Sequence, residues 1–291
     1  MRSDGQNKAS FKDVILRRAN VAGNVDMIGA SLGGKLVADN LRVGGNLYMR
    51  SDDQNKARFK DVDLTGAEIK GQIDMDGASF GKLDAEFLQA LGSLVMRSVG
   101  QNKASCTEAK LNSAAEFLQA IGSLVMRSAG PNTASVTLNR ANITGQISMA
   151  GANFDRKLDA EVLQVGGDLF IRDAHFAQAV DMVFAHIGGN LDLSGAILAD
   201  LNLSSASITG DLLLSRPGMH TVWKGKNWEL GTLTLRNTHI GNLADAQDPW
   251  PAREHLHLDG LSFNHLGGFK EEAGEKMPAE KMDWWDNWSR Y

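Results

Sequence analysis

The sequence predicts an all-β fold, a right-handed parallel β-helix solenoid of about ten 21–22-residue coils with a short C-terminal helical cap. A five-residue phrase, glycine–polar–aliphatic–any–Met/Leu/Ile, recurs ten times along the chain. Around these glycines apolar and polar residues alternate, which is typical of a strand with one buried and one solvated face. A coil of this length leaves no room for the helical crossover between parallel strands of an open sheet, so the strands are expected to stack as coils.

The period follows from the spacing of the phrase. Its copies read GNVDM, GNLYM, GQIDM, GSLVM, GSLVM, GQISM, GDLFI, GNLDL, GDLLL and GTLTL. Successive glycines are 22, 26, 21, 30, 23, 22, 22, 21 and 21 residues apart, so the longer steps indicate loop insertions. The glycines are Gly23, Gly45, Gly71, Gly92, Gly122, Gly145, Gly167, Gly189, Gly210 and Gly231.

A second ladder supports the same repeat. Phe11, Phe59, Cys106 and Val136 hold equivalent places in ASFKD, ARFKD, ASCTE and ASVTL, and Phe176 fits this position when an insertion is removed. Cys106 is therefore expected in an apolar stack, where cysteine behaves as a small hydrophobe. Because it is the single cysteine of the chain, no intrachain disulfide can form.

The repeat pattern divides the chain into two parts. Residues 1–236 form the predicted β-helix, and residues 237–291 form a C-terminal capping segment that ends in a Trp-rich helix. Pro278 at a first helical position, with Glu280 soon after, predicts the start of this helix. The helix is expected to cover the last coil or to present a partner surface, because aromatic side chains dominate binding hot spots. Its aromatic residues are Trp284, Trp285, Trp288 and Tyr291.

Composition narrows the function classes. With 30 basic and 35 acidic residues the net charge is −5, which argues against a nucleic-acid partner, since that would require a basic face. The chain contains no run of about 18 apolar residues, so no transmembrane helix is expected. The first residues, MRSDGQNKASFKDV, lack the apolar stretch of a secretory signal, and we expect a cytoplasmic protein.

Several segments carry a resemblance to a known family. The coils VGGNLYM, VGGDLFI and IGGNLDLSGA, followed by LHLDGLSFNHLGGF and a WW-x-x-W helix, resemble bacterial β-helical repeat proteins labelled "membrane-associated oxidoreductase". More distantly the chain is similar to pentapeptide-repeat proteins, which form right-handed quadrilateral β-helices. Members of the first family continue past the tryptophan helix, and the segment at Met1 matches the middle of a coil at Met49. The resemblance thus implies truncation at both ends.

The residues do not support the oxidoreductase label. A dinucleotide site requires GxGxxG after a strand and opening a helix. The glycine pairs of this chain, such as Gly44–Gly45 and Gly166–Gly167, lie inside predicted strands that no helix follows. No cofactor is therefore expected. The pentapeptide resemblance implies a different role, since some such proteins mimic DNA and bind type II topoisomerases, which would require a continuous acidic stripe.

Three groups of polar residues are candidates for a catalytic or metal-binding role. The outward position three residues after each repeat glycine holds acids only two or more coils apart, at least about 9.6 Å, which is a poor pair for cleaving a polysaccharide. The position directly after the glycine is polar in every copy and indicates a solvated face. His255 and His257 form an HxH pair without a third ligand at fixed spacing, although His239 and His265 are near in sequence, so a surface pair and no metal are expected.

These observations lead to one functional hypothesis. We expect a non-enzymatic structural or protein-interaction solenoid, which binds a protein partner or associates with itself through its ends. The alternatives are a polysaccharide-active β-helix enzyme, which predicts a groove with two acids within about 10 Å, and a DNA-mimicking protein that binds topoisomerase. A carbohydrate partner is a further alternative, but no sequence feature supports it.

Overall fold

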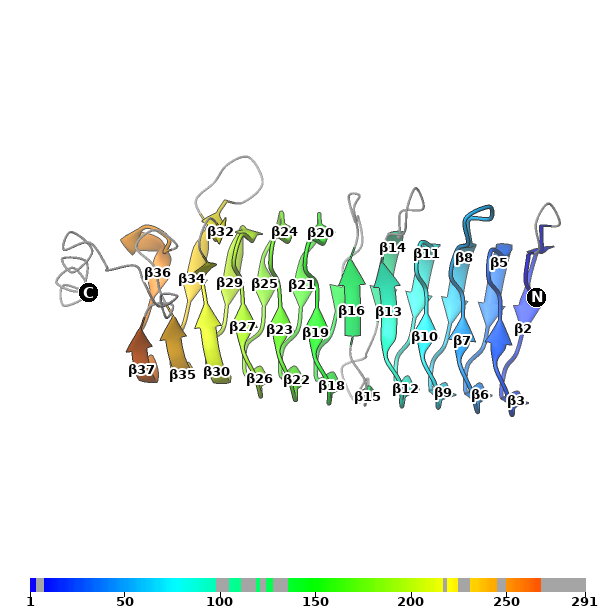
Figure 1. Cartoon of the computed structure of the whole chain (residues 1–291), viewed down its shortest axis with the longest axis horizontal. Helices are drawn as coiled ribbons and strands as arrows, with labels where there is room; N and C mark the ends of the chain where they lie inside the picture. The colour runs from blue at the N-terminus through cyan, green and yellow to red at the C-terminus, as the bar shows by residue number, and fades with distance from the viewer. Residues whose placement is uncertain are drawn as a thin grey trace, which may run out of the picture.

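The computed structural model is an elongated parallel β-solenoid whose coils stack along the long axis (Figure 1). It describes residues 1–3, 8–97, 105–110, 119–120, 124–127, 136–216, 219–224, 231–244 and 250–267. Within these ranges the regular structure is β, apart from the 3-10 turn η2 (Arg253–His255). The predicted all-β solenoid is therefore confirmed. The C-terminal helix expected near the end of the chain lies outside the described residues.

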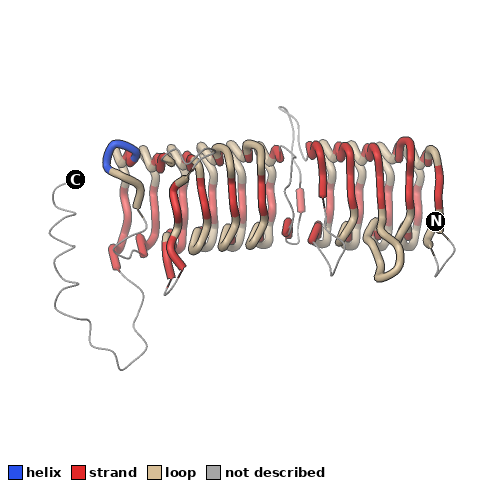
Figure 2. Tube along the Cα trace, turned by 90° about the horizontal axis from the view of Figure 1, so that it is seen from above, coloured by secondary structure: helices blue, strands red, loops and turns tan. Residues whose placement is uncertain are grey.

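Two large parallel sheets run the length of the solenoid (Figures 1 and 2). The first contains β1 (Ser10–Phe11), β2 (Val14–Ile15), β5 (Ser31–Val37), β8 (Arg58–Asp63), β11 (Ser79–Asp84), β14 (Ser105–Lys110), β17 (Val136–Thr137), β21 (Leu158–Asp159), β25 (Val180–Asp181), β29 (Asp200–Asn202), β34 (Thr232–Thr234) and β36 (Leu256–His257).

The second sheet forms two adjacent columns. One column contains β3 (Asn20–Val21), β6 (Arg42–Val43), β9 (Glu68–Ile69), β12 (Gln89–Ala90), β15 (Gln119–Ala120), β18 (Asn142–Ile143), β22 (Gln164–Val165), β26 (His186–Ile187), β30 (Ser207–Leu213), β35 (His239–Ala244) and β37 (Ser262–Gly267). The other contains β4 (Val25–Asp26), β7 (Leu47–Tyr48), β10 (Ile73–Asp74), β13 (Leu94–Arg97), β16 (Leu124–Arg127), β19 (Ile147–Ser148), β23 (Leu169–Phe170) and β27 (Leu191–Asp192), and it joins the first at β30.

A short third sheet covers the remaining side of the later coils. It contains β20 (Asn153–Phe154), β24 (His175–Phe176), β28 (Ile197–Leu198) and β33 (Val222–Trp223). The hairpin of β31 (Ser215–Arg216) and β32 (Met219–His220) is antiparallel, whereas the other pairings of the described strands are parallel. A later coil therefore contributes one short strand to each of four sides.

The strand register confirms most of the predicted period. In the column that starts at β3, the successively paired residues are 22, 26, 21, 30 and 23 residues apart, the same steps as between the repeat glycines. Those residues are Val21, Val43, Ile69, Ala90, Ala120 and Ile143. Parallel pairing also continues past residue 236, because β37 pairs with β35.

The tenth copy of the repeat phrase was assigned wrongly. GTLTL, at Gly231, forms β34 of the first sheet, where Leu233 pairs with Leu201. The residue that follows Asp211 in the glycine column is instead Asn242, preceded by Gly241. The hairpin β31–β32 and strand β33 lengthen this coil. Every side of the coil has the same apolar alternation, so the phrase alone did not identify its side.

The aromatic ladder also differs from its prediction in two members, Val136 and Phe176. Phe59 stacks on Phe80 with ring centroids 5.3 Å apart, and Phe80 pairs with Cys106 in the next strand. Val136, expected to follow Cys106, pairs with Ala109 instead. Phe176 stacks on Phe154 at 4.7 Å in the third sheet. The insertions between these coils shift the register that the sequence motif predicted.

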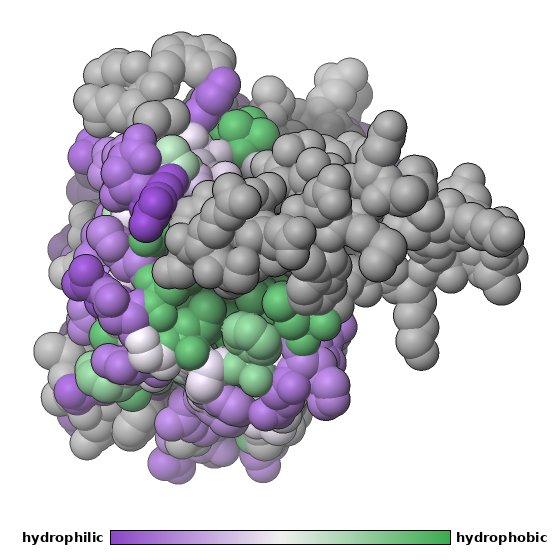
Figure 3. All heavy atoms as spheres, turned by 90° about the vertical axis from the view of Figure 1, so that its left-hand side faces the viewer, coloured by the Kyte–Doolittle hydropathy of each residue, from purple (hydrophilic) through white to green (hydrophobic). Residues whose placement is uncertain are grey.

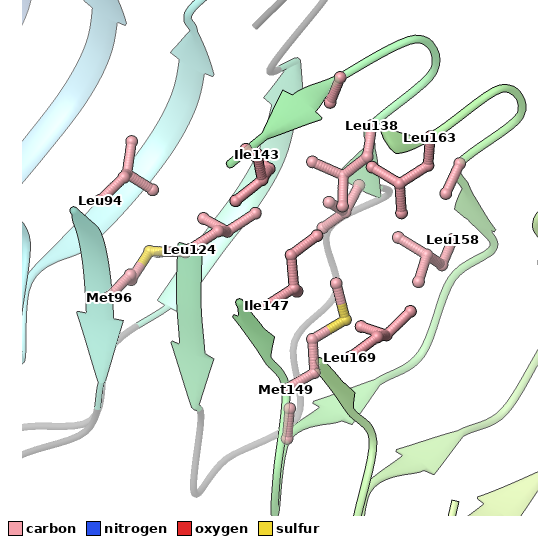
Figure 4. Packing of buried hydrophobic residues seen from close by; sticks show 14 of the residues in the cluster. Leu94, Met96, Leu124, Leu138, Ile143, Ile147, Met149, Leu158, Leu163 and Leu169 are labelled. Carbon is pink, nitrogen blue, oxygen red and sulfur yellow. The ribbon is translucent and has the colours of Figure 1, made fainter. Parts of the chain in front are cut away.

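The core is a set of axial columns of aliphatic side chains. In the column shown in Figure 4, each strand places one residue directly beside its equivalent in the next coil. These residues are 2 % exposed or less, so each is removed from water by the coils on both sides. They are Leu94, Leu124, Ile147 and Leu169.

A polar ladder holds one corner of the coils together, at the position predicted to be a solvated face. At this corner the Gly45 N–H donates to Gly23 of the preceding coil and the Leu47 N–H donates to Gln72 of the following coil. The N–H of the intervening Asn46 donates to the Asn24 side-chain oxygen at 2.7 Å. This corner is therefore a structural hydrogen-bonding position, because the side chain supplies an acceptor where the backbone supplies none.

The glycine of the repeat makes room for this side chain. A Cβ atom at Gly45 would lie 2.2 Å from the Asn24 Oδ1, and one at Gly210 would lie 2.3 Å from the Asn190 Oδ1. At Gly23, by contrast, a Cβ atom would have nothing within 4 Å. The glycine and the polar residue after it therefore recur together because each coil needs the space and the acceptor in the same place.

We expect Gly45→Ala to lower the free energy of unfolding by about 1–3 kcal/mol, because the added methyl group collides with the Asn24 amide. Gly23→Ala is the matched control and should change it by less than about 0.5 kcal/mol. Urea unfolding followed by circular dichroism measures both. In Asn24→Ala/Gly45→Ala the loss should be smaller than the sum of the single losses. Equal effects of the two glycine substitutions would refute the steric explanation.

Candidate functional site

A cluster of alternating charges lies on the outer face of three consecutive coils. Asp74 and Asp76 both belong to the coil of β10, on either side of the buried Met75. Arg97 of the following coil holds Asp76 through both carboxylate oxygens, with the shortest distance 2.6 Å from Nη2 to Oδ2. Arg50 of the preceding coil lies 3.4 Å from Asp74. The charges therefore alternate in sign from coil to coil.

Burial changes the proton affinity of one of these acids. Burial raises the pKa of Asp74 above its ordinary value of 3.8, and the neighbouring Asp76 carboxylate raises it further. The Asp76 backbone N–H and the two arginines oppose this rise. The hydrogen bond to Asp76 also raises the pKa of the Arg97 guanidinium. Both carboxylates are bound by arginine. This arrangement therefore resembles a structural charge ladder more than the catalytic acid and base of a glycoside hydrolase.

Sequence reasoning missed this acid pair because it compared a single outward position. Asp76 stands two residues after Asp74, at the position that holds Arg50 and Arg97 in the neighbouring coils. Aligning every position of the coils, rather than the one three residues after glycine, would have placed Asp76 between the two arginines. The same alignment also shows that this face lacks the continuous acidic stripe that the DNA-mimic alternative predicts.

A second charged group lies farther along the same face. Asp192 is fully buried, and its Oδ2 lies 3.3 Å from the Arg172 Nε of the preceding coil. The Arg172 guanidinium also lies over the Phe170 ring, 4.4 Å from its centroid. The Asp192 Oδ1 accepts the Ser194 backbone N–H at 3.1 Å. This group connects neighbouring coils as the first charge cluster does.

The HxH pair lies near the C-terminal end of the described chain. His255 ends the turn η2, and its Nδ1 lies 3.4 Å from the Thr232 hydroxyl. His257 lies in β36, whereas His239 and His265 belong to β35 and β37 of the other sheet. His239 contacts the Ser262 hydroxyl at 3.1 Å. Among the described residues, no three His, Cys, Asp or Glu side chains are grouped closely enough to hold a metal ion.

The C-terminal end of the solenoid presents an apolar surface framed by hydrophilic residues (Figure 3). Phe263 of β37 is 37 % exposed, whereas its paired residue Ile240 in the preceding coil is fully buried. Leu256, Leu258 and Leu266 of the last coil are likewise only partly buried. The expected partner surface formed by Trp284, Trp285, Trp288 and Tyr291 lies outside the described residues.

A polar groove of about 490 Å³ crosses the corner between the first and second sheets in the N-terminal coils. Its residues occupy two repeat positions on four successive coils, and the residue type changes from coil to coil at both positions, so no sequence motif marks them. Asn20, Arg42, Glu68 and Gln89 line it from the strands β3, β6, β9 and β12. Arg18, Asn40 and Gly66 line it from the turns that precede those strands.

The described parts of the chain contain no helix long and apolar enough to span a membrane. Comparison with protein-family models, with curated proteins and with solved structures found no match to this chain. The fold therefore defines it as a parallel β-solenoid, and the resemblance to oxidoreductase-labelled repeat proteins stays a prediction.

We expect Asp74→Asn to raise the free energy of unfolding at pH 7. Because its pKa is raised by folding, the folded chain holds the Asp74 proton more tightly than the unfolded chain, and ionisation destabilises the fold as pH rises above about 3.8. The gain should disappear below this pH, where both states are protonated. Urea unfolding at pH 3 and pH 7 measures it.

The matched variant on the same coil, Asp76→Asn, should behave in the opposite way. It breaks the two-pronged hydrogen bond to Arg97, and we expect a loss of about 1–3 kcal/mol at pH 7. A loss of stability in Asp74→Asn as well would show that its pairing with Arg50 outweighs burial.

Proposed function

We propose that this protein is a non-enzymatic structural solenoid of the cytoplasm that associates with further copies of itself through its ends. The apolar C-terminal surface supports the proposal, because side chains that interior coils bury remain partly exposed there (Figure 3). In the described part of the chain β37 pairs only with β35, and β3 pairs only with β6. Such strand edges are templates for pairing with another chain.

Charge complementarity favours a head-to-tail arrangement. Along one turn position of the coils, Arg17 lies 2.7 Å from Asp39, and Arg236 lies 3.1 Å from Asp259. When a second copy continues the stack in register, its Arg17 follows Asp259 of the first copy at the usual coil spacing of about 4.8 Å. Asp259 is 82 % exposed, so its carboxylate is accessible to a second guanidinium group besides that of Arg236.

The apolar residues of the two end coils also match. Strand pairing places Leu256 in the column of Val14, and Phe263 in the column of Val21. Burying these side chains against one another would remove the exposed apolar surface from water, which is the main driving force for protein association.

A charge swap tests the register. We expect the chain to show a scattering mass above 31.4 kDa that grows with concentration. Asp259→Arg or Arg17→Asp alone should weaken association, because each places like charges across the junction, and the double variant should restore it. Asp53→Arg changes an exposed acid of a loop and should leave the mass unchanged.

A chain that is monomeric at every concentration would overturn the proposal. For a monomer or an oligomer, serine substitution of Trp284, Trp285 and Trp288 separates two roles of the tryptophans. If the tryptophans form an intramolecular cap, the variant loses stability as a monomer. If they form the contact between copies, the wild-type chain is an oligomer and the variant becomes a folded monomer, which would contradict the charge-swapped junction.

A further inference from the structure

The polar groove at the corner of the N-terminal coils departs from the repeat in a way that suits a ligand. Its turn column consists of Arg18, Asn40 and Gly66, all with left-handed backbone at φ 55°, 54° and 65°. The fold imposes this conformation at the same turn of many coils, but only Gly66 of these three lacks a side chain. A Cβ atom on Gly66 would lie 3.0 Å from the Asn40 Oδ1, so the Asn40 amide projects over this gap.

The groove carries more positive than negative charge. Its two guanidinium groups, of Arg18 and Arg42, face one carboxylate, that of Glu68. Arg42 lies 3.7 Å from Glu68 in a loose pair that leaves the arginine side chain 71 % exposed. Within the described residues, the Arg18 side chain forms neither an ion pair nor a hydrogen bond. The guanidinium groups are thus available to an anionic group of a ligand.

The rest of the lining is made of groups that both donate and accept hydrogen bonds. Asn20, Asn40 and Gln89 each present an amide N–H₂ and a carbonyl oxygen, and all three are exposed. Sugar hydroxyl groups require both kinds of partner, and Glu68 supplies a further acceptor. The groove extends over four coils, about 14 Å, which is long enough for a short oligosaccharide.

We propose that this groove binds an acidic oligosaccharide, with the arginines on its carboxylates and the amides on its hydroxyl groups. The groove lining holds one acid, Glu68, and so lacks the pair of carboxylates that glycoside hydrolysis uses. This site lies on the side of the coils and is independent of association through the ends.

Isothermal titration calorimetry of the full chain with trigalacturonate at low salt tests the proposal. We expect saturable binding with one ligand per chain, weakened at least about 10-fold by Arg18→Gln or by Arg42→Gln, because each removes a charge-assisted hydrogen bond. Gly66→Asn should also weaken binding, since asparagine tolerates the left-handed conformation and fills the gap. Arg140→Gln is the matched control, as Arg140 holds the equivalent turn position outside the groove.

Comparison with two other ligands shows which groups of trigalacturonate the groove recognises. Maltotriose, a neutral trisaccharide, should bind more weakly than trigalacturonate, and inorganic phosphate should not displace it at equal concentration. If maltotriose binds as tightly as trigalacturonate, the arginines do not contribute to affinity and the proposal is wrong. If phosphate displaces trigalacturonate at equal concentration, the groove binds anions in general rather than an oligosaccharide, which also contradicts the proposal. Absence of trigalacturonate binding, or equal loss in Arg140→Gln, would overturn the proposal. Circular dichroism of each variant verifies that the fold is unchanged.

Discussion

The hydrogen bond that one coil's backbone N–H donates to a polar side chain of the preceding coil is the interaction on which the solenoid depends. Between the two columns of the second sheet the backbone donors change direction, from the preceding coil at Gly45 to the following coil at Leu47. The amide between them is satisfied only because an Asn or Asp oxygen reaches across from the preceding coil. The same bond, 2.7 Å long, recurs four times: the backbone N–H groups of Asn46, Gln72, Asn190 and Asp211 donate to the side-chain oxygens of Asn24, Asn46, Asp168 and Asn190, respectively.

Stacking also constrains the charges of the outer faces. Each residue of a coil has the equivalent residue of the neighbouring coil as its closest lateral neighbour, about 4.8 Å away, so a column of one charge would repel itself. Arg50, Asp74, Asp76 and Arg97 avoid this repulsion by alternating, and Arg172 and Asp192 do the same. Where like charges do pair, at Asp159 and Asp181, Lys157 lies within 4.0 Å of both carboxylates.

The proposed sites lie where the repeat is interrupted. Interior coils bury their aliphatic columns on both sides, because each coil is covered by a neighbour in both directions. The apolar C-terminal surface arises where the described coils end, and the N-terminal groove arises where Gly66 leaves a gap between arginine- and amide-bearing coils. Self-association and ligand binding therefore use different departures from one repeated scaffold.

The sequence by itself determined the solenoid. Strict alternation and the glycine spacing are local properties, and a 22-residue period allows few structures other than stacked coils. It did not determine which side of a coil a segment occupies. GTLTL at Gly231 has the glycine phrase typical of the second sheet, but its strand pairs in the first sheet. The glycine spacing aligns Asp76 with Arg97, but Arg18 and Glu68 lie two coils apart and share a groove only when insertions have set the register. Period and alternation are encoded locally, whereas contacts between coils depend on the lengths of all the loops between them.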